Sequence, residues 1–166
     1  MFGHPDPDPP GPGQESVWDY PRPAIAGPTD RHIVIRHHGV TLADTRAAWR
    51  TLETSHPPTY YIPQADIAMA HLSPNGRRSL CEWKGQAHYW DIEIASERIE
   101  AAGWSYPDPD PSFAGIAGHV AFYPEPFDEV LVDGEQVVPQ PGGFYGGWIT
   151  SGEAGPFKGI TGSRFW

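Results

Sequence analysis

The stretch Ala87-His88-Tyr89-Trp90-Asp91-Ile92-Glu93-Ile94 carries the plainest secondary-structure signal in the chain. Bulky side chains at the even positions 88–94 alternate with mostly polar ones at the odd positions. A period of two places such side chains on opposite faces of a β-strand. Just before it, Leu80-Cys81-Glu82-Trp83 is followed by Lys84-Gly85. The segment therefore predicts two strands joined by a tight turn.

Similar signals extend in both directions along the chain. Short β-branched or aromatic runs bounded by turn residues predict further strands, and Asp133-Gly134 is the strongest hairpin signal present. For residues 45–54 a strand is favoured over a marginal helix, whereas residues 64–71 predict the best short helix. The predicted strands are His32–Arg36, Val40–Thr45, Thr59–Ile62, Trp104–Tyr106, His119–Tyr123, Glu129–Val132 and Gln136–Val138.

The composition agrees with an all-β domain. The chain has 166 residues, with 20 Pro, 19 Gly, and 7 each of Trp, Tyr and Phe. So many chain breakers and rings favour short strands and ordered loops over long helices. Only one cysteine, Cys81, is present, which excludes an internal disulfide and a multi-cysteine zinc site within one chain.

The charge balance limits the classes of partner. Lys and Arg number 11 against 21 Asp and Glu, giving a net charge of -10. Nucleic acid and anionic membranes both require a cationic surface, so we expect neither as a partner. No apolar run reaches the ~18 residues of a membrane span, and the opening MFGHPDPDPP resembles no targeting segment. We therefore expect a cytoplasmic protein.

Four regions follow from shifts in composition. Residues 1–16 carry almost no apolar surface and predict a disordered or loosely attached arm. Residues 17–30 contain rings among prolines and predict an extended segment that packs on the domain. Residues 31–138 form the core domain. Residues 139–166 predict an ordered glycine- and aromatic-rich tail, because their rings are costly to leave in water.

The eight histidines do not predict a metal centre. A zinc site needs three or four ligands, two of them close together on one face. His88 and His119 on neighbouring strands could pair with a carboxylate, but no HExxH-type spacing exists. We therefore expect separate histidines, no metal and no cofactor.

Cys81 has two interpretations. A lone cysteine is more often a small buried hydrophobe than a nucleophile. Cys81 lies three residues from Lys84, however, and a nearby cation raises thiolate reactivity. With a histidine such as His119 as base, Cys81 could act as a catalytic thiolate.

The tyrosines and tryptophans around the central strands suggest a pocket. Large rings usually form core, but Tyr and Trp also carry polar groups that need partners, and pocket walls favour such residues. The residues concerned are Tyr60, Tyr61, Trp83, Tyr89, Trp90, Trp104 and Tyr106. No glycine-rich phosphate loop, GxSxG or paired-carboxylate motif accompanies them.

Four spaced motifs resemble a known family. They are ETSHPPTYYIP at 53–63, CEWKGQAHYW at 81–90, AGWSYP at 102–107 and IAGHVAFY at 116–123. In this order they resemble the bacterial, cyanobacterial and fungal family Domain of Unknown Function 427, sometimes labelled nucleotidyltransferase-like, over roughly residues 31–138. The family's usual Cys-Pro-aromatic-Lys-Gly reads Cys81-Glu82-Trp83-Lys84-Gly85 here. No Gly-Ser plus paired-Asp metal site supports the nucleotidyltransferase label.

The resemblance implies a small β-tent-like domain of two antiparallel sheets, with an irregular N-terminal arm and a glycine- and aromatic-rich tail. Methionine sulfoxide reductase B and the thalidomide-binding domain of cereblon are similar to this group. They hold a small ligand in a cleft between two sheets, often against aromatic side chains. Many carry a four-cysteine zinc that a chain with one cysteine cannot supply.

We therefore expect a domain that binds a small polar or carbonyl-bearing molecule in an aromatic-lined cleft. Lys84 would supply a fixed positive charge and His119 a titrating donor or acceptor. The walls would be Tyr61, Trp83, Trp104 and Tyr106. The alternatives are a thiol-dependent enzyme using Cys81, with His119 as its base, and a non-catalytic protein-interaction module. A homodimer is left open.

Overall fold

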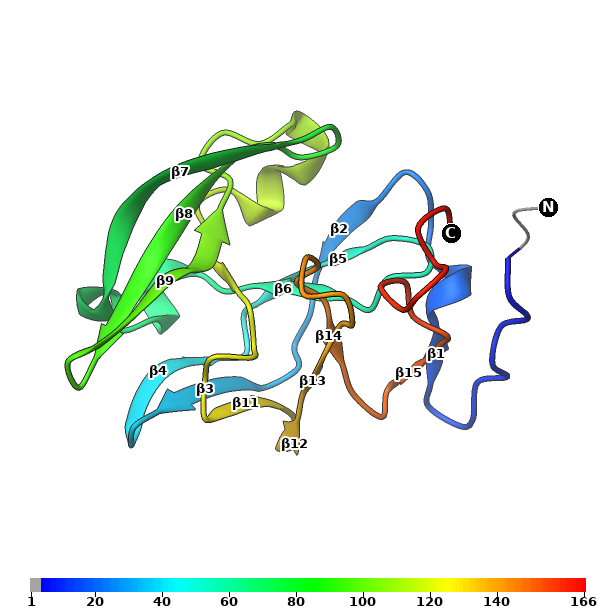
Figure 1. The fold of residues 1–166 in the computed structure, drawn as a ribbon, viewed down its shortest axis with the longest axis horizontal. Coiled ribbons are helices and arrows are strands. Elements are labelled where there is room, and N and C mark those ends of the chain that lie inside the picture. The colour runs from blue at the N-terminus through cyan, green and yellow to red at the C-terminus, as the bar shows by residue number, and fades with distance from the viewer. Residues whose placement is uncertain (1–3) are drawn as a thin grey trace.

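The computed structural model describes residues 4–166, and strands dominate it (Figure 1). Within those residues every helix is a short 3₁₀ helix, and none could cross a membrane. The expected all-β class with short helices is therefore confirmed. Residues 1–3 of the predicted arm lie outside the described residues. In chain order the elements are β1 Glu15–Ser16, η1 Val17–Asp19, β2 Ile25–Pro28, β3 Ile33–His37, β4 Val40–Thr45, β5 Trp49–Leu52, β6 Thr59–Tyr61, η2 Gln64–Asp66, η3 Met69–His71, β7 Leu72–Cys81, β8 Gly85–Ile94, β9 Glu97–Ser105, η4 Pro111–Ile116, β10 Ala121–Phe122, β11 Glu129–Val132, β12 Glu135–Gln136, β13 Val138–Pro139, β14 Trp148–Ile149 and β15 Glu153–Ala154.

Three antiparallel sheets form the body of the molecule. Sheet I has the strand order β10-β9-β8-β7, sheet II has the order β12-β11-β3-β4, and sheet III has the order β2-β5-β6. In Figure 1 sheet I lies above sheet II, and sheet III lies beside them towards the termini. Two small ladders join β13 to β14 and, in parallel, β1 to β15. The body therefore has three antiparallel sheets where the family resemblance implied two.

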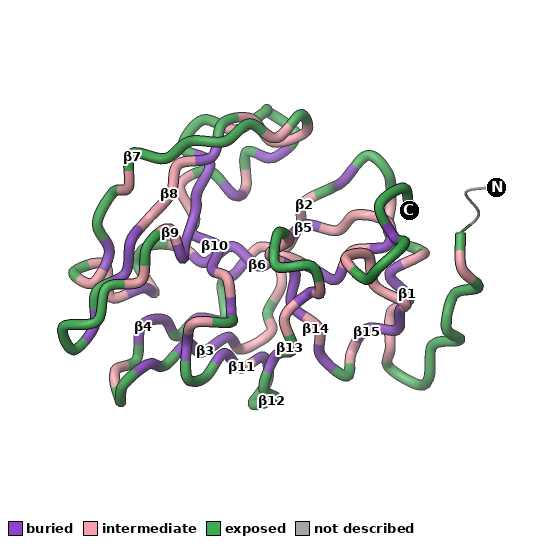
Figure 2. The backbone as a smooth tube through the Cα atoms, viewed as in Figure 1, coloured by how far each residue is buried: buried purple, intermediate pink, exposed green. Residues whose placement is uncertain are grey.

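Two clusters of buried side chains hold the sheets together. The larger includes Ile33 from sheet II and Ile92 from sheet I, and the smaller includes Trp104. Figure 2 shows the buried backbone concentrated where the sheets face one another. Tyr60 and Tyr61 are consecutive in β6, so their side chains point to opposite faces. Tyr60 therefore joins the larger cluster and Tyr61 the smaller one.

The hairpins of sheet II form where the sequence predicts them. β3 and β4 are joined by His38 and Gly39, whose φ angles are 48° and 76°. β11 and β12 are joined by Asp133 and Gly134, with φ angles of 50° and 81°. Two consecutive positive φ angles match the right-handed twist of the flanking strands. Local turn chemistry therefore decides both hairpins.

The hairpin of β7 and β8 is much longer than its sequence signal. β7 already begins at Leu72 and includes Pro74, which pairs with Trp90 across the ladder. A proline cannot donate to a ladder, so it is tolerated only on an edge strand, and β7 is the edge of sheet I. A register shift between Trp90 and Ile92 interrupts the predicted alternation of β8 and leaves Asp91 buried.

The predicted short helix over residues 64–71 is wrong as a continuous element. The structure has two 3₁₀ turns, η2 and η3, separated by Ile67 and Ala68. Ala68 N–H donates to the carbonyl of Leu42 in β4 at 2.8 Å, and Ile67 bridges to Ala43. Backbone pairing with a neighbouring strand therefore replaces the intrahelical bonds.

The predicted strand His119–Tyr123 is shorter than expected, because only Ala121–Phe122 belongs to sheet I. Val120 instead exchanges hydrogen bonds with Ile62 at 2.8 and 2.9 Å. The chain thus moves from one pairing partner to another within a few residues. The partner strands decide this change of pairing, and the local sequence does not predict it.

The N-terminal segment contacts the rest of the chain. Glu15 in β1 binds the Arg50 guanidinium through both carboxylate oxygens, at 2.7 and 3.0 Å. The Asp8 N–H donates to the carbonyl of Gly155 at 2.8 Å. Residues of the predicted arm 1–16 therefore form hydrogen bonds and an ion pair with the rest of the chain. The disordered or loosely attached arm stays a prediction.

Candidate ligand-binding site

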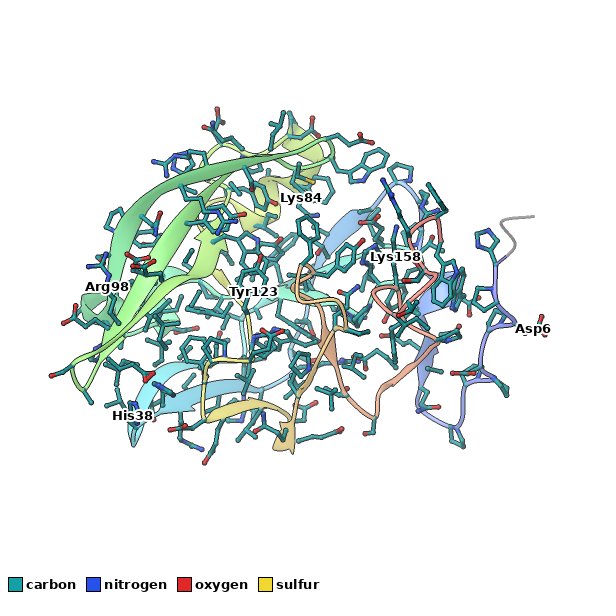
Figure 3. The ribbon with its side chains drawn as sticks, in the orientation of Figure 1. Asp6, His38, Lys84, Arg98, Tyr123 and Lys158 are labelled. Atoms are coloured by element: carbon teal, nitrogen blue, oxygen red, sulfur yellow. The ribbon has the colours of Figure 1, made fainter. Side chains whose placement is uncertain are left out.

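A cavity of about 460 Å³ opens beside the smaller buried cluster. It is bordered by the β7–β8 turn, by β5, β6 and β9, and by the chain after residue 139. That volume lies within the usual range of small-molecule sites. Lys84 stands at the tip of the β7–β8 hairpin in Figure 3, and Lys158 lies on the C-terminal segment.

The structure brings most of the predicted site residues together. Tyr61, Trp83, Lys84, Trp104 and Tyr106 all line the cavity. They come from β6, the β7–β8 turn, β9 and the residue that follows β9. Their convergence needs side chains of sheets I and III to pack in one cluster, which no local pattern specifies. Whether they bind a ligand stays a prediction.

Of the predicted site residues, His119 lies elsewhere. It precedes β10 and does not line the cavity. Its Nδ1 lies 3.3 Å from the carbonyl oxygen of Ala117, two residues away. His119 therefore has a local contact in place of the predicted role in the pocket.

The β7–β8 turn fixes Lys84 at the cavity. Gly85 has a φ of 111°, which L-residues rarely adopt. The N–H of Asp110 donates to the carbonyl of Lys84 at 2.9 Å and ties the turn to the loop between β9 and η4. The Lys84 ammonium lies 5.7 Å from the centroid of the Phe113 ring and 3.9 Å from Cys81 Sγ. Among residues 4–166 no carboxylate forms an ion pair with it.

The rings of the walls pack against each other and against backbone. Trp104 and Tyr123 have centroids 4.6 Å apart, and Tyr61 and Tyr106 have centroids 6.3 Å apart. Gly146 lies against the Trp104 indole so closely that a Cβ there would overlap the ring. Burial raises the pKa values of Tyr61 and Tyr106 above their usual range. Their hydroxyls therefore stay neutral at physiological pH.

The cavity differs in charge from the chain as a whole. Its charged lining residues are Arg77, Lys84 and Lys158 against Glu53 and Glu82, whereas the whole chain has a net charge of -10. The lining is therefore cationic by one charge when His56 is neutral. A positive pocket in an acidic protein attracts anions and oxygen acceptors locally.

Sequence reasoning missed the part of the wall that follows residue 139. Gln140, Phe144, Tyr145 and Lys158 line the cavity together with His56, which precedes β6. The rings of the tail already predicted an ordered segment, but no pattern related them to the β7–β8 turn. His56 could have been noticed only as one of eight histidines.

Cys81 also lines the cavity and is half-buried. Within residues 4–166 the only hydrogen bond to its Sγ comes from Lys84 Nζ, at 3.9 Å. A base nitrogen would have to lie within hydrogen-bond reach to activate the thiol. The structure shows no histidine in that position among the described residues.

A second cluster of ionisable side chains lies at the β3–β4 turn and the start of β9. His37, His38 and Glu97 could together offer ligand atoms to a metal ion. The Nδ1 of His37, however, accepts a hydrogen bond from Asp128 N–H at 3.1 Å, so the proton of the neutral ring is on Nε2. That Nε2 lies 2.9 Å from a Glu97 oxygen and donates to it. Both ring nitrogens of His37 are therefore already engaged in hydrogen bonds.

A family model for a domain of unknown function, DUF427, matches residues 25–133. The chain belongs to this family. No curated protein matches this DUF427 chain. The matched residues include Tyr61, Trp83, Lys84, Trp104 and Tyr106. The C-terminal wall of the cavity lies outside the matched part of the DUF427 protein.

Proposed function

We propose that the protein binds a small molecule with a flat, ring-bearing body and a carbonyl or carboxylate oxygen in this cavity. The single observation that carries the proposal is the position of Lys84, a half-buried cation at an aromatic-lined cavity with no carboxylate partner among residues 4–166. A cation that loses water needs an anion or an acceptor oxygen in return. A ligand oxygen would supply it.

The ring walls support the rest of the proposal. Aromatic side chains have few rotatable bonds, so they bury a planar ligand with little loss of conformational entropy. Leu80 and Phe144, both strongly exposed, also line the cavity. Covering them would remove apolar surface from water and favour binding further.

The two alternatives have weaker support. The thiol-dependent enzyme requires a base beside Cys81, and only the Lys84 ammonium lies near its sulfur within residues 4–166. A protein-interaction module would need a flat apolar patch, whereas the exposed ring of Phe144 borders a concave site. We therefore retain small-molecule binding as the proposal.

The proposal is tested with the full-length protein in two steps. Native mass spectrometry, compared with the mass of the denatured chain, detects any small molecule that co-purifies. Benzoate, a ring with one carboxylate, is then titrated while tryptophan fluorescence is recorded, because Trp83 and Trp104 line the cavity. The absence of both a co-purified molecule and a saturable response to ring carboxylates would overturn the proposal.

The variant Lys84→Met removes the charge but keeps most of the side-chain volume. A hydrogen bond to a charged group contributes about 1.5–3 kcal/mol, so benzoate affinity should fall by roughly 10- to 150-fold. Arg36→Met is the matched control, because Arg36 lies exposed on β3 and pairs with Glu129. It should leave benzoate affinity unchanged. Equal effects in both variants would show that overall charge, and not Lys84, controls binding.

A further inference from the structure

The side chain of Gln140 links three segments behind the cavity. It is buried, and its Oε1 accepts a hydrogen bond from Gly147 N–H at 3.2 Å. Its Nε2 donates to the carbonyl of Lys158 at 2.9 Å. A backbone N–H can only donate and a backbone carbonyl can only accept. These two contacts therefore settle which end of the amide is oxygen and which is nitrogen.

The orientation of this amide decides the tautomer of His56. Gln140 Nε2 lies 3.0 Å from His56 Nδ1. Because the amide nitrogen has only hydrogens to offer, Nδ1 must accept with its lone pair. A neutral imidazole carries one proton, so the proton of His56 is on Nε2.

The surroundings of His56 keep it neutral. Burial lowers the pKa of His56, and the nearby cations Lys158, Lys84 and Arg22 lower it further, against the opposing effect of Glu53. A second proton on Nδ1 would also face the amide hydrogens of the glutamine. The ring therefore stays in one tautomer across the physiological pH range.

We propose that His56 is a fixed hydrogen-bond donor of the ligand site through Nε2, that Gln140 is its positioning residue, and that the ligand places a neutral carbonyl oxygen there. This extends the proposed function, because it names a second recognition point beside Lys84. Among residues 4–166 the hydrogen bond of the His56 ring is at Nδ1, and Glu53 Oε2 lies 3.7 Å from Nε2, beyond hydrogen-bond distance. The Nε2–H group is therefore left without a hydrogen-bond partner among those residues. The charge of that carboxylate disfavours an anion at this point and favours a neutral acceptor.

The same tautomer excludes a role for His56 as the base of a thiol enzyme. A general base needs a free lone pair within reach of the proton that it removes. The lone pair of Nδ1 is already occupied by the amide of Gln140, and Nε2 carries the proton. His56 can position and polarise a carbonyl group, but it cannot activate Cys81 in this state.

The tautomer is measured first, in the unliganded full-length protein. Long-range ¹H–¹⁵N correlation spectra distinguish a protonated from an unprotonated ring nitrogen, and the His56→Asn variant assigns the signals. We expect His56 to show a protonated Nε2 and an unprotonated Nδ1 at neutral pH. A ring protonated on Nδ1 would overturn the proposal, whatever ligand the protein binds.

The variant Gln140→Glu tests the positioning role. A carboxylate at this place accepts from His56 and should move the ring proton to Nδ1. The matched control is Gln136→Glu, the same chemical change at an exposed position in β12. It should leave the His56 signals unchanged. If the proton of His56 stays on Nε2 in a folded Gln140→Glu protein, the positioning role of Gln140 is refuted.

Acetophenone, a ring with one neutral carbonyl oxygen, tests the recognition. It should shift the His56 Nε2–H signal of the wild type and bind Gln140→Glu about fivefold more weakly, the loss of one neutral hydrogen bond. Binding that quenches tryptophan fluorescence but leaves the His56 signals unmoved overturns the recognition role and leaves the proposed function standing. If neither acetophenone nor benzoate binds and no small molecule co-purifies, the proposed function fails, and with it the role in recognition, while the spectra still decide the tautomer.

Discussion

Gly146→Ala should both destabilise the protein and deform the wall of the cavity. A Cβ at this position would overlap the edge of the Trp104 indole, and it would lie 2.8 Å from Cζ2. Carbon atoms prefer to lie about 3.5–4.0 Å apart, and Cη2 lies even nearer than Cζ2, so the ring and the loop must separate by roughly 1–2 Å. Trp104 is buried and packs against the tilted ring of Tyr123, which leaves it little room to move.

The expected magnitude follows from this overlap. Overpacking of a buried site costs about 1–3 kcal/mol, and 1 kcal/mol shifts the Tm of a chain of this length by about 2–4 °C. Thermal unfolding should therefore show a decrease of roughly 2–12 °C. Tryptophan emission should also change in the folded state, because the indole of Trp104 is displaced.

Gly27→Ala is the matched control for this experiment. Gly27 lies in the edge strand β2, and a Cβ there would meet nothing within 4 Å. It should change the Tm by less than 2 °C, as surface substitutions usually do. If Gly146→Ala unfolds at the same temperature as Gly27→Ala, the close approach of the loop to Trp104 is refuted.

Three further predictions concern stability. The buried Asp91 carboxylate accepts hydrogen bonds from Asn75 and from a backbone N–H, and these lower its pKa below the usual value. The stabilising effect of the carboxylate is present at neutral pH and is lost as the pH falls through the lowered value. In denaturation experiments at decreasing pH, Asp91→Asn should therefore reduce the free energy of unfolding most near pH 7 and least in acid. Cys81→Ala should cost about 1 kcal/mol and leave benzoate binding intact, whereas fast alkylation of the native thiol at neutral pH would revive the thiol-enzyme interpretation. Deleting residues 1–13 should leave the Tm nearly unchanged. Deleting residues 1–16 should lower the Tm by on the order of 5 °C, because the longer deletion also removes Glu15, which pairs with two arginines. Equal Tm values for the two truncations would contradict this role of Glu15.

Much of the candidate site could be anticipated from the sequence, but for different reasons in different parts. Trp104 and Tyr106 are alternate residues and share a face, and the family resemblance implied that Tyr61 and Trp83 lie nearby. The structure places all four at one cavity with Lys84. His119 was expected there as a titrating polar anchor, but it does not line the cavity, and the next residue, Val120, pairs with Ile62.

The sequence by itself determined the all-β class and the hairpins of sheet II. Side-chain alternation and turn residues such as Asp133-Gly134 act over a few positions, so they are readable without knowing the partners. The helix expected over residues 64–71 failed for the complementary reason. Its backbone groups found a better partner in β4, and such tertiary pairing overrides a weak local preference.

Only the tertiary structure decided how the cavity is closed. His56 and Gln140 are 84 residues apart in sequence, yet one hydrogen bond between them selects the tautomer of the histidine. That contact depends on Gly147 and Lys158 holding the amide from two further segments. Periodicity and turn chemistry describe neighbours along the chain, whereas the orientation of a buried amide depends on every group packed around it. The tertiary structure therefore decides which ring nitrogen of His56 carries the proton.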